Sequence, residues 1–344
     1  MSARACIVPV FIPHLGCPYA CVYCDQRRIS GQHGPVSEEL VEHAIERAAA
    51  LPRTGTRRQL AFYGGSFTAI PAEEQIRLLT PAKAAIDRGE IDCVRLSTRP
   101  DAIDAETLER LRAFGVETIE LGAQSMDDEV LRLSGRGHTA SDVAAASRLI
   151  RGAGFQLVLQ MMTGLPGDSP GRAIETARRI ISLRPDGVRI YPTVIVRGTE
   201  LHERYLKGEY REHTVEDAVS ICAKLVPLFE RTGIEVIRVG LDPTEELSGG
   251  EAVAGAYHPA LGELVRSRIW LDKARRLLRD VPSGAGVVLG APREKLSQVI
   301  GQKRGNLRTL CEELGLRELR VRGLEDGETE LRILSVTDGN CARS

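Results

Sequence analysis

Residues 5–25 read ACIVPVFIPHLGCPYACVYCD, an apolar strand-like run followed at once by three closely spaced cysteines. These are Cys17, Cys21 and Cys24. A disulfide scaffold is typical of short secreted chains, which this chain of 344 residues is not. The spacing therefore indicates a metal or redox centre. Its place directly after a strand is where a parallel α/β fold carries its chemistry.

Composition sets the broad class of the protein. The chain is 42% apolar and 27% charged with a formal net charge of −1, which is ordinary for a globular protein. The charge balance gives no global bias toward nucleic acid, so binding of a polyanion would need a local basic patch. The sequence has no long apolar run and no signal-peptide pattern. We expect a cytoplasmic protein without a membrane segment.

Short apolar runs alternate with longer amphipathic runs over roughly the first 245 residues. The expected strands are 5–12, 59–63, 93–97, 118–122, 156–162 and 187–192, and the expected helices are 38–51, 72–86, 105–114, 140–153 and 171–183. About six such β–α repeats favour a parallel sheet with helices packed outside it, either doubly wound or closed as a barrel.

This alternation breaks at the glycine-rich stretch 247–251. We therefore expect a first domain over residues 1–245 and a small appended domain over residues 246–344. In the appended part the expected helices are 259–278, 293–300 and 307–314, and the expected strands are 286–290, 319–323 and 329–334. The result is a small α+β domain.

Three cysteines supply one ligand fewer than an iron–sulfur cubane normally takes. An iron left without a protein ligand can bind the amino and carboxylate groups of S-adenosylmethionine (SAM). Two other interpretations stay open at this point. A structural zinc ion could use His14 or His33 as a fourth ligand, although the spacing differs from the usual paired Cys-x-x-Cys halves. The three cysteines could also be ordinary core residues.

The cysteine spacing, with an aromatic residue before the third, resembles the signature of the radical SAM superfamily. Further short motifs follow later strands, namely 64–68, 97–101, 122–125, 135–139, 164–167 and 191–199. Taken in order, they resemble the radical SAM core of the Elongator catalytic-subunit family, which modifies the wobble uridine of tRNA. Several of them also occur in the oxygen-independent coproporphyrinogen oxidase branch. The resemblance covers roughly residues 5–240 and implies an α/β fold with a partial (β/α)6 TIM-like barrel.

The resemblance implies a [4Fe–4S] cluster on the three cysteines and reductive cleavage of SAM to a 5′-deoxyadenosyl radical. It implies SAM contacts by Gly64, Gly65, Tyr23, Gln124, Arg136 and Gln160. We expect substrate contacts by Tyr191 and Arg197, because these residues close the last strand on the open face of the barrel. The glycines would approach the SAM amino group, Arg136 its carboxylate, and the two glutamines its ribose. Each of these residues also has a plain structural interpretation. The two glycines could form an ordinary strand-to-helix turn, and Arg136 could be an exposed arginine on a helix surface. The two glutamines could be hydrogen-bonded interior amides, and Tyr23 could pack beside the cluster.

The family also carries a C-terminal acetyltransferase domain, which this sequence does not resemble. The nearest string, 298–303, has Lys303 where the acetyl-CoA loop needs a small residue, so we expect no acetyl-CoA site. Instead, residues 299–306 between two expected helices resemble the Gly-x-x-Gly loop of a KH module, with one extra residue. Lys303 and Arg304 would contact phosphates there. The alternative is a solvated helix pair.

The leading hypothesis is a radical SAM enzyme, a transferase or an oxidoreductase, that acts on tRNA or another RNA. It would take electrons from a donor such as flavodoxin or ferredoxin. One alternative is a radical SAM enzyme acting on a small molecule such as a porphyrin. A third possibility is a non-catalytic haem-binding or chaperone protein on the same fold.

Overall fold

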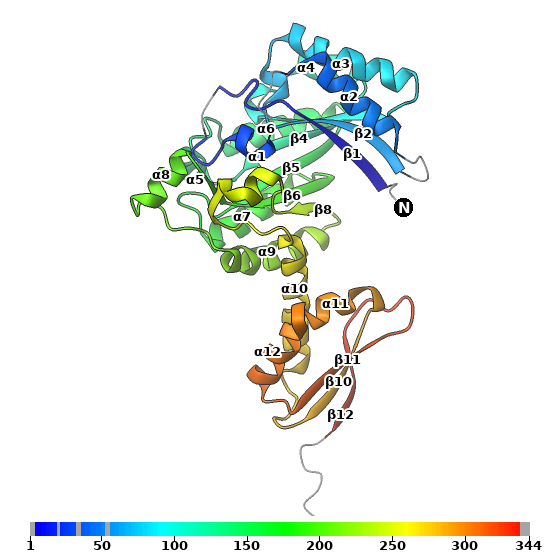
Figure 1. Cartoon of the computed structure of the whole chain (residues 1–344), viewed down its shortest axis with the longest axis vertical. Helices are drawn as coiled ribbons and strands as arrows, with labels where there is room; N and C mark the ends of the chain where they lie inside the picture. The colour runs from blue at the N-terminus through cyan, green and yellow to red at the C-terminus, as the bar shows by residue number, and fades with distance from the viewer. Residues whose placement is uncertain (1–3, 19–20, 32–35, 52–55, 338–344) are drawn as a thin grey trace, which may run out of the picture. The chain divides into compact units, whose positions relative to one another are not determined.

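The computed structural model describes residues 4–18, 21–31, 36–51 and 56–337 (Figure 1). The chain divides into two compact units, the first of residues 1–221 and 225–259 and the second of residues 222–224 and 260–344. The boundary expected after residue 245 falls instead after Pro259. The reason is that strand β9 (Ala252–Gly255) pairs antiparallel with β7 (Val194–Val196) and so binds this segment to the first unit.

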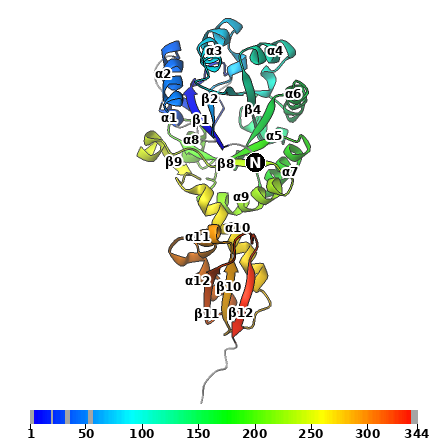
Figure 2. The ribbon, with the colours of Figure 1, turned by 90° about the vertical axis from the view of Figure 1, so that its right-hand side faces the viewer.

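A curled parallel sheet forms the centre of the first unit, with its helices outside (Figure 2). Its order is β1-β2-β3-β4-β5-β6-β8. The strands are β1 (Arg4–Phe11), β2 (Thr56–Tyr63), β3 (Cys93–Thr98), β4 (Val116–Gln124), β5 (Gln156–Thr163), β6 (Gly187–Pro192) and β8 (Glu235–Val239). Parallel strands covered by helices are buried on both faces, as every residue of β3 is. The expected partial barrel is confirmed, with β8 added at its edge.

The helices of the first unit are α1 (Gln26–Ser30), α2 (Glu38–Ala49), α3 (Ala72–Asp87), α4 (Ala105–Ala113), α5 (Asp128–Leu133), α6 (Ala140–Gly152), α7 (Pro170–Ser182), α8 (Glu200–Leu206) and α9 (Val215–Glu230). The first turns of all these helices except α3 are capped by side chains that accept backbone N–H groups, and Thr139 and Thr214 form complete capping boxes. The expected helices and strands of this unit lie within a few residues of the observed ones. Helices α1, α5, α8 and α9 were not expected.

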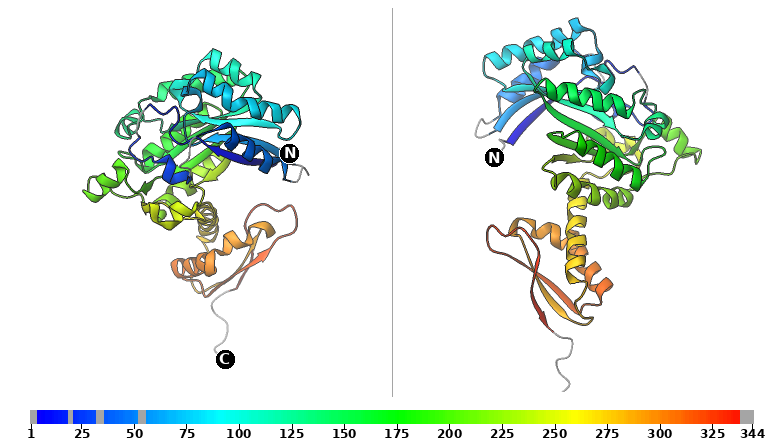
Figure 3. Two further views of the ribbon diagram at one scale, coloured as in Figure 1. Left: turned by 45° about the horizontal axis from the view of Figure 1, so that its top comes forward. Right: turned by 180° about the vertical axis from the view of Figure 1, so that it is seen from behind.

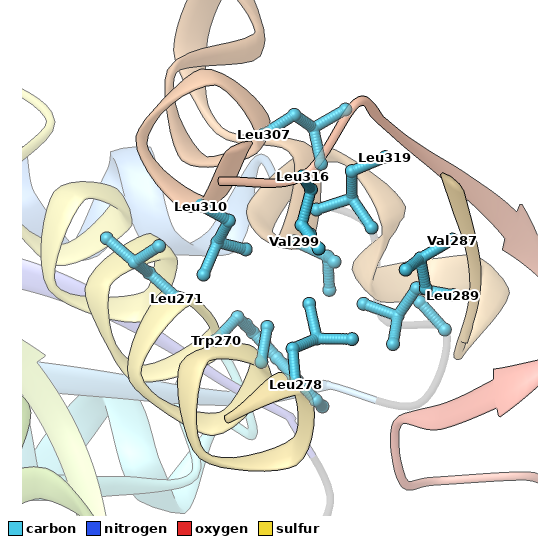
Figure 4. Packing of buried hydrophobic residues seen from close by; sticks show 12 residues of the cluster. Trp270, Leu271, Leu278, Val287, Leu289, Val299, Leu307, Leu310, Leu316 and Leu319 are labelled. Atoms are coloured by element: carbon cyan, nitrogen blue, oxygen red, sulfur yellow. The ribbon is translucent and has the colours of Figure 1, made fainter. Parts of the chain in front are cut away.

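The second unit packs three helices against one face of a three-stranded sheet (Figure 3). Its elements are α10 (Leu261–Leu278), β10 (Gly286–Ala291), α11 (Leu296–Ile300), α12 (Gly305–Leu314), β11 (Glu318–Gly323) and β12 (Arg332–Thr337). Strand β10 lies in the middle, parallel to β11 and antiparallel to β12. Trp270, Leu278, Leu289 and Leu310 belong to its buried core (Figure 4). The last strand begins at Arg332, later than the expected start at residue 329.

No helix in the described part of the chain has both the length and the apolarity needed to cross a bilayer.

Candidate functional site: a cysteine-lined cavity in the half-barrel

The loop after β1 places all three cysteines of the motif on one cavity. This cavity has a volume of about 550 Å³ and extends from the cysteine loop into the half-barrel. Cys17, Cys21 and Cys24 line it together with inward-facing residues of the strands. The three thiols are free of disulfides. The cavity is where a parallel fold of this kind binds its ligands, at the carboxyl ends of the strands.

The glycine pair after β2 holds the base of the cysteine loop. The His14 amide donates to Gly64 O at 2.9 Å, and the Ser66 amide donates to Leu15 O at 2.8 Å. A Cβ atom on Gly65 would lie only 2.5 Å from the carbonyl oxygen of Leu15, so no side chain fits there. Gly64 has a φ of +88°, a conformation that favours glycine. Both glycines also line the cavity, as expected of residues near a bound ligand.

The electrostatics of the thiols fit a cationic centre. Burial, followed by the charge of neighbouring Cys21, raises the pKa of the Cys24 thiol to about 12. The same two causes raise the pKa of Cys17. Burial and a neighbouring thiolate thus oppose the deprotonation of Cys17 and Cys24, and a bound cationic cluster would offset both.

Donors to sulfur are already in place around the loop. Gln26 Nε2 donates to Cys24 Sγ at 3.4 Å, and Arg136 Nη1 donates to Cys21 Sγ at 3.3 Å. Such N–H contacts stabilise thiolate ligands of an iron–sulfur cluster. No three His, Cys, Asp or Glu side chains in the described part of the chain converge on a point for one metal ion. The residues fit a cluster because N–H donors already contact two of the three thiols.

Arg136 and Gln124 present unused polar atoms at the cavity. Arg136 is 7% exposed and donates through Nη2 to Gly122 O at 2.7 Å. Its Nε, and the Oε1 of Gln124, have no hydrogen-bond partner among the described residues. Both side chains line the cavity. Since buried polar atoms are nearly always hydrogen-bonded, this pair fits the binding of a polar ligand.

The neighbouring His138 is neutral. Burial, together with the nearby positive charge of Arg136, lowers its pKa to about 4. Its Nε2 lies 3.3 Å from the carbonyl oxygen of Ala123, so that nitrogen carries the proton. His138 is thus a structural hydrogen-bonder.

A second polar centre lies deeper in the half-barrel and is built around Glu120 of β4. Its carboxylate is fully buried and accepts hydrogen bonds from side chains of four other strands, listed with their distances: Tyr63 Oη (2.8 Å), Arg95 Nη1 (2.9 Å), Gln160 Nε2 (2.9 Å), Arg189 Nε (2.9 Å) and Arg189 Nη2 (3.1 Å). Although burial alone would raise it, the two guanidiniums hold the pKa of Glu120 below its usual range. The carboxylate is therefore ionised.

Of the remaining residues expected at the site, some line the cavity and one does not. Tyr23 and Tyr191 line the cavity. Gln160 also lines it, but its amide donates to Glu120, so the interior-amide interpretation describes it better than ribose binding. Arg197 lies outside the cavity lining, half exposed, and donates to Gly250 O at 3.0 Å. The chain turns away from the barrel after β7, which separates Arg197 from the strands it was expected to close.

Glu120, Arg95 and Arg189 were not predicted as site residues from the sequence. The sequence could have indicated these three residues, because each is a charged residue inside a run expected to be a buried parallel strand. Lys303 and Arg304 belong to the second unit, on the loop between α11 and α12, and both are exposed.

The half-barrel and its cysteine-lined cavity define a known class of protein. The model of the radical SAM superfamily matches residues 11–180, and that of the radical SAM C-terminal domain matches residues 185–270. The chain belongs to the radical SAM superfamily, whose members are enzymes. The superfamily implies a [4Fe–4S] cluster and SAM.

Within this superfamily the chain is homologous to the core of Elongator complex protein 3. It is 30% identical to the human protein over 71% of this chain and 47% of that protein. It is 29% identical to the tRNA uridine(34) acetyltransferase of Dehalococcoides mccartyi over 65% of this chain and 57% of that protein. The structure of archaeal Methanocaldococcus infernus Elp3 has the same fold, with a TM-score of 0.63 at 23% identity over 78% of this chain and 63% of that one. The chain thus matches about half the length of these relatives.

Proposed function

We propose that this chain is a radical SAM enzyme that modifies tRNA or another RNA, with Cys17, Cys21 and Cys24 as the ligands of a [4Fe–4S] cluster. The observation that carries the proposal is the placement of these three thiols on the cavity of a half-barrel homologous to the Elongator core. The name of a relative, tRNA uridine(34) acetyltransferase, supports RNA as the substrate. Flavodoxin or ferredoxin is the kind of protein that would supply electrons.

When bound, a [4Fe–4S] cluster and SAM would supply radical hydrogen-atom abstraction from the substrate. The residues of the chain bind and orient. Arg136, which lines the cavity, would balance the negative charge of the cysteine thiolates through its contact with Cys21 and pair with a ligand carboxylate. Gln124 offers an acceptor oxygen beside it. Gly65 keeps the cysteine loop close to the cavity, because only a glycine fits against that backbone.

The second unit supports contact with RNA through a small group of cations. Lys303, Arg304 and Arg308 are exposed and form no ion pair within the described residues. The loop that carries the first two is held by Asn306, whose Nδ2 donates to backbone oxygens of Ser267 and Gln298 at 3.2 and 3.0 Å. Fixed, unpaired cations of this kind suit the phosphates of a nucleic acid.

The test of the enzyme class is anaerobic reconstitution, iron counting, and an assay for 5′-deoxyadenosine after reduction with dithionite. We expect about four irons per chain, as a cubane requires, and 5′-deoxyadenosine in the presence of SAM. Cys24→Ala should lose both, whereas the control Cys311→Ala, in the second unit, should keep both. A cluster that forms without any SAM cleavage would contradict the proposed activity, and zinc in place of iron would contradict the proposed centre.

RNA binding is tested separately by the salt dependence of affinity for total tRNA. Removing two phosphate contacts with Lys303→Ala/Arg304→Ala should weaken binding and reduce the slope of log K against log salt by roughly 1.4 to 1.8. The control Arg151→Ala/Arg178→Ala removes two exposed arginines from the outer helices of the first unit and should leave the slope unchanged. Equal slopes for both double variants would contradict the proposed role of the second unit.

A further inference from the structure

The interior of the half-barrel holds more positive than negative charge. Two guanidiniums, those of Arg95 and Arg189, are paired with the single carboxylate of Glu120. All three residues are less than a tenth exposed. One buried positive charge is therefore left without a counter-charge in this group. Because an uncompensated charge is costly to bury, a fold keeps one where a ligand or another group offsets it.

The excess charge faces the cavity through Arg189. Its Nε and Nη2 are engaged with Glu120, and Nη2 also with Tyr63 Oη at 3.1 Å. Its Nη1 makes no hydrogen bond to any residue that the structure describes, and the side chain lines the cavity. Two N–H groups of a buried guanidinium are thus available to a ligand.

The neighbours of Arg189 in the sheet add further donors. Gln160 of β5 and Arg238 of β8 are its register partners on either side, and both also line the cavity. Tyr191 lies at the next inward-facing position of β6. Burial raises the pKa of Tyr191 to about 12, so its hydroxyl stays protonated and can donate. Arg238 is itself paired with Asp242 and leaves the net charge of the group unchanged.

This donor group is separate from the cysteine loop. Arg136, the cation beside the thiols, bonds to Gly122 of β4, which pairs with Gln160 of β5, which in turn pairs with Arg189 of β6. The guanidinium of Arg189, however, bonds to Glu120 of β4, two residues before Gly122, so the two arginine subsites are separated by two residues along β4, roughly 7 Å. Of the two arginines, Arg136 is the one that contacts a cysteine sulfur.

We propose that the half-barrel interior binds a small organic carboxylate, a second ligand beside SAM, with its carboxylate on Arg189 Nη1 and Tyr191 Oη. A carboxylate carries the one negative charge that the group lacks, whereas the phosphate dianion carries two. A polynucleotide backbone cannot bring its phosphates to a side chain so deeply buried. The site goes beyond the proposed RNA modification and does not require it.

The test is ligand-observed NMR with the reconstituted holoprotein and three probe acids, propionate, pyruvate and succinate, each paired with its uncharged amide. Inorganic phosphate is the fourth probe. We expect at least one acid to bind with millimolar or better affinity, and its amide at least tenfold more weakly. Arg189→Gln should weaken binding of that acid at least tenfold, since it removes the charged donor. Arg189→Lys, which keeps the charge, should retain part of the affinity. The control Arg178→Gln, on the outer surface of α7, should bind like the wild type.

A variant that fails to fold would also lose binding of the acid, so a second variant with balanced buried charge is needed. Glu120→Gln/Arg189→Gln removes one charge of each sign and should keep the iron content and circular dichroism of the wild type while losing the acid. The proposal is overturned if the wild type binds none of the acids, if the amides bind equally well, or if either variant lacking Arg189 retains full affinity. Tighter binding of phosphate than of every acid would overturn it as well and would assign the site to a phosphoryl group. None of these measurements depends on SAM cleavage or on RNA. This proposal and the proposed function can therefore be refuted independently of each other.

Discussion

Replacing Glu120 by glutamine tests whether the buried network stabilises the first unit. The substitution keeps the shape of the side chain but removes the only carboxylate between Arg95 and Arg189. Both guanidiniums would then be buried without a counter-charge. Removing one partner of a buried ion pair costs about 3–5 kcal/mol, and Glu120 is fully buried, so solvent screening does not reduce this figure.

The effect should appear in thermal and urea unfolding followed by circular dichroism. A loss of about 3–5 kcal/mol corresponds to a fall in Tm of roughly 6–20 °C for a unit of this size. Trp270, the only tryptophan, lies in the second unit. Its fluorescence therefore follows that unit separately and should change less.

The same strand supplies the matched control. Glu117 of β4 forms an ion pair with Arg57 at 2.8 Å, and both side chains are 40% exposed. Because solvent screens that pair, Glu117→Gln should cost at most about 1 kcal/mol. If Glu120→Gln costs no more than Glu117→Gln, the network around Glu120 does not contribute as the structure indicates, and the reasoning from buried charge is wrong.

Three further outcomes are expected. Gly65→Ala places a Cβ 2.5 Å from one carbonyl oxygen and should destabilise the first unit by about 1–3 kcal/mol in urea unfolding, whereas Gly171→Ala meets nothing closer than 3.9 Å and should change stability by less than about 0.5 kcal/mol. His138 has a folded pKa of about 4 against 6.5 in the unfolded chain, so the unfolded chain binds more protons between these values and stability falls as the pH drops from 6.5 to 4. His138→Gln should lessen that loss by on the order of 2–3 kcal/mol, and an unchanged pH profile would show that His138 is not held neutral. Asn306→Ala removes the side-chain amide that donates to the carbonyl oxygens of Gln298 and Val299, and should lower the free energy of unfolding followed by Trp270 fluorescence by about 1–3 kcal/mol. Gln302→Ala, exposed on the same loop, should not.

Much of the first unit could be predicted from the sequence because its signals are local. Strand and helix periods depend on neighbouring residues, and the expected elements of the barrel lie close to the observed ones. The cysteine loop could be placed at the reactive end of the sheet for the same reason. In a parallel fold, the loop after a strand lies at its carboxyl end whatever the order of the strands.

The limits of the two units could not be read from local pattern. The glycine-rich stretch 247–251 breaks the helix–strand alternation as a domain linker would. Its continuation β9 nevertheless pairs with β7, more than fifty residues earlier in the chain, and thereby belongs to the first unit. Arg197 was misplaced for the same reason, since its position depends on where this distant segment packs.

What the sequence by itself determined is the alternation of elements, the parallel α/β class, and the three cysteines together with the chemistry their spacing favours. Only the tertiary structure decided which inward-facing side chains meet. Glu120, Arg95 and Arg189 come from three strands, and their contact depends on strand order, register and the curl of the sheet. The physical reason is that secondary structure follows from short-range sterics and periodicity. The pairing of buried charges follows from long-range packing, which no single stretch of sequence contains.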